Sequence, residues 1–199
     1  MKKSIQLLIL LIIIGCGNQH STEFVVNCKT DKAGDAILLQ VDPFNTIMDT
    51  TSIKNGKFLF KKTLTEQEWF KLKFYDGSSM DLLVEPGEKI DIQLYEQELN
   101  ITGSVGSKKL MELESKLGLL MAFRDSITKE VQLLRNNSEY EITLSKARES
   151  FYIKLEEHRQ FLKAFIEENK NSKAALVALF QQYGRSSYVL SVDEDLVDF

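Results

Sequence analysis

Two different periodicities divide the chain. Apolar and polar residues alternate over much of 24–102, whereas apolar residues recur every three to four positions between 107 and 184. A period of two is typical of half-buried strands, and a period near 3.6 is typical of helices with one buried face. The pattern therefore predicts an α+β chain: an N-terminal antiparallel β-sandwich of seven or eight strands, then an antiparallel helical hairpin and a short third helix.

Tight-turn sequences separate the expected strands. Asn55-Gly56 lies between two β-prone runs, where a two-residue hairpin turn needs positive φ angles. Glu85-Pro86-Gly87-Glu88 is a second turn, since proline presets φ and glycine tolerates the left-handed region. Short strands with turns every 8–12 residues indicate a sandwich or barrel domain at 24–104. The expected strands cover residues 24–29, 36–42, 47–53, 57–63, 69–75, 80–84, 89–94 and 99–102.

Two long apolar stripes predict the helical hairpin of a second domain at 107–184. The first runs from Leu110 to Leu134 and is interrupted by Arg124, and the second runs from Tyr140 to Phe165. Asn136-Asn137-Ser138 lies between them as a helix break. Two long helices joined by a short turn should pack antiparallel.

The segment after the hairpin predicts a third helix over residues 173–183. Asn171 or Ser172 can cap its N-terminus, and Gly184 can end it. Residues 185–199 are polar and then acidic, and we interpret them as a tail or a truncated linker.

The N-terminus has the pattern of an export signal. Lys2 and Lys3 precede an apolar run at 5–14, and the run ends in Gly15-Cys16. The run is shorter than the roughly 20 residues that a membrane-spanning helix needs. A cysteine directly after a small residue resembles the bacterial lipobox, which implies a signal peptide at 1–15, cleavage before Cys16, a lipid on Cys16 and a tether at 16–23. The alternatives are plain secretion and an uncleaved anchor.

Charge and cysteine content limit the possible partners and chemistry. The net charge is −4, and removal of residues 1–15 takes away Lys2 and Lys3 and makes it −6. A mildly acidic chain without a basic cluster argues against nucleic acid as a partner. With Cys16 lipidated, Cys28 stands alone; we interpret it as a half-buried strand residue, with a reactive thiol as the alternative. The chain has no CxxC motif and cannot by itself carry out dithiol–disulfide exchange.

No complete catalytic or metal-binding motif occurs. His20 and His158 are far apart, and His158 falls on an apolar stripe, as a packed residue would. The segment 103–107 lacks the spacing of a phosphate-binding loop, and no GxSxG motif is present. The acidic pair Glu156-Glu157 is typical of a solvated helix face. We therefore expect no catalytic residue, cofactor or metal in this chain.

The strand at 69–75 offers a possible binding face. Trp69, Lys71, Lys73 and Tyr75 share one side of it. The alternative, that its aromatic residues mainly supply the core, is favoured because a small sheet needs large side chains.

Several short motifs together resemble a known family. They are Ile53-Lys54-Asn55-Gly56-Lys57-Phe58, the segment 83–90 around the Pro86-Gly87 turn, Ile101-Thr102-Gly103-Ser104, and the pair of segments 165–169 and 172–175. With the lipobox, they resemble the N-terminal domain of unknown function of bacterial lipoproteins that continue into a thioredoxin-like thiol–disulfide oxidoreductase domain.

The chain departs from that family in two ways. Cys28 stands where the family usually has glycine, and the thioredoxin-like domain with its paired cysteines is absent, so no catalytic residue carries over. The end at Phe199 suggests an N-terminal portion of such a protein or a natural short version.

The resemblance and the lipobox lead to one functional expectation. The protein is expected to be a membrane-anchored envelope lipoprotein, facing the periplasm of a Gram-negative bacterium. It would be a non-catalytic scaffold that docks a thioredoxin-like domain or a separate redox protein. The alternative is a stand-alone lipoprotein that binds a protein or a small ligand on its sandwich or its hairpin. The hairpin could equally dimerise.

Overall fold

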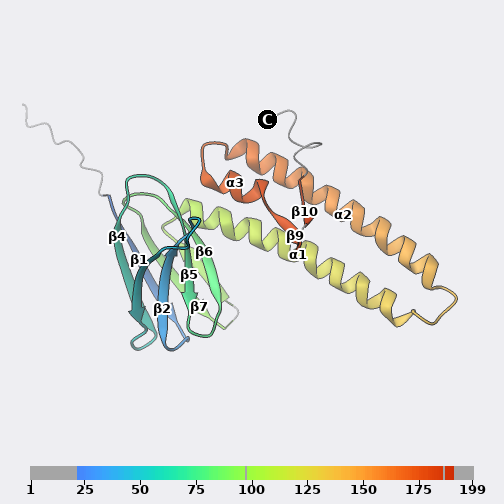
Figure 1. Ribbon diagram of the computed structural model, residues 1–199, viewed down its shortest axis with the longest axis horizontal. Helices are drawn as coiled ribbons and strands as arrows, with labels where there is room; N and C mark the ends of the chain where they lie inside the picture. Colours follow the sequence, from blue (N-terminus) through green and yellow to red (C-terminus); the bar gives the residue numbers. More distant parts are fainter. Residues whose placement is uncertain (1–21, 97, 186, 191–199) are drawn as a thin grey trace, which may run out of the picture.

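The computed structural model describes residues 22–96, 98–185 and 187–190 (Figure 1). The expected signal peptide, Gly15, Cys16, nearly all of the tether and the acidic segment 191–199 lie outside these residues. The predictions about lipidation and the tail therefore stay predictions.

Two four-stranded sheets form the N-terminal part. Their strand orders are β4-β1-β7-β8 and β3-β2-β5-β6. The eight strands are β1 (Glu23–Thr30), β2 (Asp35–Gln40), β3 (Ile47–Ser52), β4 (Lys57–Thr63), β5 (Glu68–Phe74), β6 (Ser79–Val84), β7 (Lys89–Tyr95) and β8 (Glu98–Thr102). The predicted α+β fold with an eight-stranded sandwich is confirmed.

One strand pair differs from the prediction. β1 and β7 run parallel, with Val26 opposite Ile90 and Cys28 opposite Ile92, so a wholly antiparallel sandwich is wrong. Most other pairs of neighbouring strands lie close together in the chain. β1 and β7, in contrast, are separated in sequence by the strands β2 to β6. Alternation of apolar residues specifies which face of a strand is buried, and it does not specify the direction of a distant neighbour.

The sandwich core is built from alternate residues of both sheets. Phe24 of one sheet and Phe70 of the other bring their rings to a centroid distance of 5.3 Å. Phe58 and Phe74 make a second such contact at 6.0 Å. The core face of β5 is therefore the one that carries Phe70 and Phe74, and the favoured interpretation that the aromatic residues of this strand supply the core is wrong for Tyr75, which is exposed.

The helical part is a hairpin followed by a short helix. α1 (Val105–Leu133) and α2 (Tyr140–Glu168) lie antiparallel, and α3 (Lys173–Leu179) folds back beside them (Figure 1). The side chain of Ser104 caps α1 by accepting from Ser107 N–H, and Ser172 caps α3 by accepting from Ala174 N–H. The predicted hairpin and third helix are confirmed.

The end of the third helix was predicted too late. α3 stops at Leu179, and the chain then forms the small hairpin of β9 (Gln182–Gly184) and β10 (Ser187–Tyr188). The cause is tertiary: the buried side chain of Gln181 bonds His158 on α2 and the Leu113 carbonyl on α1. Local sequence does not show this contact, and strands of two or three residues carry no periodicity.

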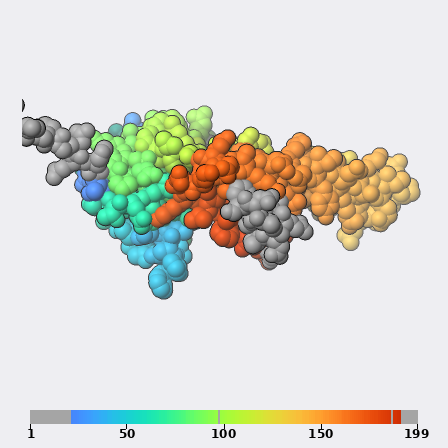
Figure 2. All heavy atoms as spheres, turned by 90° about the horizontal axis from the view of Figure 1, so that it is seen from above, coloured from blue at the N-terminus to red at the C-terminus, as the bar shows by residue number. Residues whose placement is uncertain are grey.

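β6 is the strand of the sandwich against which the first helix packs. It is an edge strand of its sheet, and α1 covers that edge. The Leu83 carbonyl accepts from Ser104 Oγ at 3.0 Å, and Ser107 Oγ accepts from Leu83 N–H at 3.2 Å. Seen from above, the distal part of the α1–α2 hairpin projects well beyond the sandwich (Figure 2). Among the residues described here, no helix is both long and apolar enough to cross a bilayer.

Candidate functional site

The predicted binding face on β5 is divided by the helical layer. Trp69 packs against the cluster of apolar side chains that joins the helices to β6. Lys71 Nζ lies 2.5 Å from Asp81 Oδ1 and forms an ion pair across the sheet. Lys73 and Tyr75 are exposed, Tyr75 to 84%. The four residues share one side of the strand, but only its far end remains an open surface.

A cleft of about 590 Å³ lies where the sandwich meets the helices. We call it the junction cleft. Trp69 forms part of its wall, and its indole Nε1–H is buried without a hydrogen-bond partner among the described residues. At its rim, Lys173 Nζ pairs with Glu68 Oε2 at 3.1 Å. The apolar residues that line it are Val41, Trp69, Leu110, Leu113, Leu117, Leu176, Val177 and Phe180.

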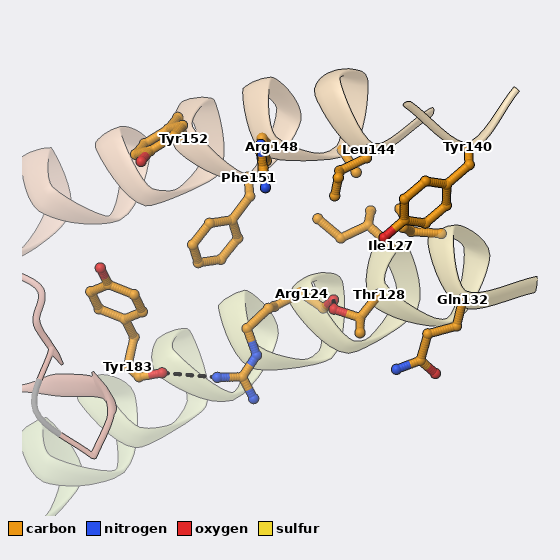
Figure 3. Close-up of a pocket in the computed structure, with 12 residues that line it drawn as sticks. Arg124, Ile127, Thr128, Gln132, Tyr140, Leu144, Arg148, Phe151, Tyr152 and Tyr183 are labelled. Carbon is orange, nitrogen blue, oxygen red and sulfur yellow. Dashed lines mark hydrogen bonds between the residues drawn. The ribbon is translucent and has the colours of Figure 1, made fainter. Parts of the chain in front are cut away.

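A second hollow, of about 500 Å³, lies between the distal halves of α1 and α2 (Figure 3). We call it the interhelical groove. The rings of Phe151 and Tyr183 come from opposite sides of it, with their centroids 5.9 Å apart. Its apolar lining residues are Ile127, Val131, Leu144, Ala147 and Phe151, and its polar ones are Arg124, Thr128, Gln132, Tyr140, Arg148, Tyr152 and Tyr183.

The two arginines of the interhelical groove differ in their environment. Arg124 Nη1 donates to the Tyr183 carbonyl at 2.9 Å, and its Nη2 lies 3.0 Å from Asp125 Oδ1. Arg124 thereby holds β9 against α1. Arg148 on α2 is exposed and has no hydrogen bond or ion pair within the described part of the chain. Among the described residues no acidic side chain lines the groove, and Arg124 is already paired with Asp125, so the uncompensated positive charge of the groove is that of Arg148.

The sequence pattern did not reveal this groove. Both stripes predict a continuous hairpin seam, and the seam has its most deeply buried residues, Leu155 and Leu162, in the half of α2 nearer the sandwich. Further out, Ile127 and Leu144 are only half-buried. The one available signal was Arg124, a charged residue on an otherwise apolar stripe.

The two residues with the most reactive side-chain types are separated in the fold. Cys28 lies in the sandwich core, and burial raises the pKa of its thiol to about 12. Cys28 is thus a strand residue as interpreted, but it is fully buried and not half-buried. The raised pKa disfavours the alternative of a reactive thiol, because only the thiolate is a good nucleophile. His158 lies on α2, and burial lowers its pKa. Within residues 22–96, 98–185 and 187–190, no cluster of three or more His, Cys, Asp or Glu could hold a metal ion.

A protein-family model matches the first part of the chain. Residues 24–110 match the model of a domain of unknown function (DUF4369). The match covers the eight sandwich strands, except Glu23 at the start of β1, and the start of α1. No curated protein matches the chain. The lipid anchor and the thioredoxin-like partner stay predictions.

Proposed function

We propose that this protein is a membrane-anchored lipoprotein of the cell envelope that docks a thioredoxin-like domain or redox protein without being catalytic itself. The observation that carries the proposal is the α1–α2 hairpin, which extends from the sandwich as an arm with exposed apolar side chains. The family match at 24–110 and the resemblance of the chain to lipoproteins with a thioredoxin-like domain support the choice of partner.

The arm is long and its base is fixed. α1 has 29 residues and is therefore about 43 Å long at roughly 1.5 Å per residue. Its start is held on the sandwich by two hydrogen bonds to the Leu83 backbone: Ser104 Oγ donates to the carbonyl, and Ser107 Oγ accepts from the N–H. Exposed apolar residues mark a surface that contacts another protein when they form a contiguous patch. On the two arm helices they include Leu119, Leu133, Ile142 and Ile153.

The expected anchor fits this arrangement. The tether at 16–23 leads into β1, which belongs to the sandwich and not to the arm. A lipid on Cys16 would thus attach the molecule through its sandwich and leave the arm available to a partner. A single acyl chain gives only marginal membrane binding, whereas several chains together give stable anchoring.

The redox chemistry would belong to the partner. Exchange of disulfides needs an accessible thiolate, and Cys28 is buried and protonated. We therefore expect the purified chain not to reduce insulin with dithiothreitol as electron donor. Turnover above the uncatalysed rate would overturn the non-catalytic assignment.

A second candidate function is a stand-alone lipoprotein that binds a small ligand. The junction cleft favours it, because its volume of about 590 Å³ falls within the range of small-molecule sites and the buried Nε1–H of Trp69 could donate to a ligand. Quenching or a spectral shift of this single tryptophan on ligand addition would support it.

Site-specific photo-crosslinking in the native envelope tests the docking proposal. A photoreactive residue is placed at Leu133 or Ile153 on the arm and, as a control, at exposed Lys57 on the sandwich. We expect the arm positions to form an adduct with a protein that contains a thioredoxin-like fold and paired cysteines. Adducts of equal yield from Lys57, or arm adducts only with proteins of other folds, would contradict the proposal.

A further inference from the structure

The interhelical groove combines an apolar wall with an unpaired cation. Ile127 on α1 faces Leu144 and Phe151 on α2 across the groove (Figure 3). The guanidinium of Arg148 lies at the same opening and has no partner among the described residues. Most polar groups that the described residues contribute to its lining are donors or hydroxyls, and none of these residues is an Asp or Glu.

These features select the ligand by charge and by shape. An anionic head can accept hydrogen bonds from the guanidinium of Arg148, and such charge-assisted bonds are roughly twice as strong as neutral ones. An apolar body can cover the half-buried side chains of Ile127 and Leu144, which removes their surface from water. A cation would meet Arg148 with the same charge, and a fully polar anion would leave the apolar wall exposed.

We propose that the interhelical groove binds an amphipathic monocarboxylate with a single apolar chain or ring system. The carboxylate lies against Arg148, and the apolar body lies between Ile127, Leu144 and Phe151. The volume of about 500 Å³ suits one such molecule, whereas a phospholipid with two acyl chains is larger than the groove. This site is independent of the docking function proposed above, since it needs neither the lipid anchor nor a redox partner.

Arg124 has a supporting role in this site. Its guanidinium N–H groups already donate to the Tyr183 carbonyl and to Asp125, so fewer of them are available to a ligand. These bonds also hold Tyr183 in place at one end of the groove. It holds Tyr183 opposite Phe151, so its replacement would disturb the shape of the groove as well as its charge. Arg148 is the better residue to test because it is exposed and has no hydrogen bond or ion pair among the described residues.

Isothermal titration of the purified chain with decanoate, below the concentration at which decanoate forms micelles, tests the proposal. Decanol and decyltrimethylammonium serve as neutral and cationic ligands of equal chain length. We expect saturable binding of one decanoate, with decanol and the cation at least about tenfold weaker. Equal binding of all three would overturn the proposal, because detergent-like adsorption would then explain it.

Two variants locate the bound molecule. Arg148→Gln should weaken decanoate binding about tenfold or more, whereas Lys146→Gln, an exposed cation of the same helix that does not line the groove, should not. Ala147→Leu keeps Arg148 but places a larger side chain in the groove, so less space remains for the apolar body of the ligand. It should therefore also weaken binding. Circular dichroism checks that each variant is folded. Unchanged affinity in both Arg148→Gln and Ala147→Leu, or the same loss in Lys146→Gln, would contradict the site.

Discussion

The imidazole Nε2 of His158 lies 2.6 Å from the side-chain Oε1 of Gln181. The amide Nε2 of Gln181 in turn donates to the Leu113 carbonyl at 3.1 Å. Because the amide nitrogen is used in this way, the oxygen of Gln181 faces the ring and accepts from the Nε2–H of His158. This chain of bonds links α2, the segment after α3 and α1 in the buried part of the helical layer.

The stability of the protein should depend on the protonation of His158. Burial lowers its pKa, the hydrogen bond to Gln181 opposes this, and the charge of Lys116 adds to the lowering. The unfolded state therefore binds the proton more tightly, so the stabilisation is fully present above about pH 6.5 and declines as the pH falls toward the lower folded pKa.

Urea denaturation between pH 8 and pH 5.5 measures this dependence. The unfolding free energy of the wild type should fall across the range by more than that of His158→Gln, in which the titrating group is absent. An NMR titration of the His158 ring should give a midpoint below pH 6.5. Parallel stability profiles for the two proteins, or a midpoint above 6.5, would contradict the assignment.

Gly103 should tolerate no side chain. Its φ is +82°, and a Cβ atom there would lie 1.8 Å from the Lys89 carbonyl oxygen. Gly103→Ala should therefore lower the unfolding free energy by at least about 2–3 kcal/mol. Gly118→Ala is the matched control: that glycine lies within α1, a Cβ there meets nothing within 4 Å, and alanine should stabilise by up to about 1 kcal/mol. Similar denaturation midpoints for both variants would contradict the positive φ of Gly103 and its close approach to the Lys89 carbonyl.

Ser107 should contribute more to stability than an ordinary helix serine. Its Oγ accepts from the buried Leu83 N–H, and Ser107→Ala would leave that donor unpaired. We expect a loss of about 1–3 kcal/mol in chemical denaturation. Ser126→Ala, at an exposed position of the same helix, should change stability by no more than about 0.5 kcal/mol. Equal effects of the two substitutions would mean that Ser107 does not hold α1 on β6.

Cys28 should be unreactive while the protein is folded. Its side chain is buried and its pKa is raised to about 12, so almost no thiolate exists at neutral pH. Iodoacetamide should modify Cys28 at a rate set by unfolding, measured by mass spectrometry in native buffer and in urea on the Cys16→Ser background. Rapid, complete labelling in native buffer would contradict a packed Cys28.

The sequence patterns were sufficient where burial is set by local periodicity. The alternation in β5 separated Phe70, Leu72 and Phe74, which are buried in the core, from the face that carries Trp69, and the two stripes located the hairpin. They failed where distant segments decide the outcome. The parallel pairing of β1 with β7 depends on how the chain between these two distant strands is routed. The early end of α3 depends on the buried contacts of Gln181.

The candidate sites were harder to predict for the same reason. Which part of the β5 face stays open depends on where α1 and α3 pack, and Trp69 alone cannot show this. The interhelical groove lies where Ile127 and Leu144 are only half-buried, whereas Leu155 and Leu162 of the same seam are fully buried. The apolar residues of the buried part and of the groove follow the same helical spacing in the sequence. Only the three-dimensional packing therefore shows which of them are buried and which line the groove.

Membrane fractionation of the full chain and of Cys16→Ser, expressed in a Gram-negative host with an alkyne-tagged fatty acid, tests the central claim most directly. We expect the wild type in the membrane fraction, resistant to high salt and labelled by the fatty acid. Cys16→Ser should be unlabelled and recovered without detergent. Equal partitioning of the two proteins, or a wild type that carries no label, would contradict a lipid-anchored docking module.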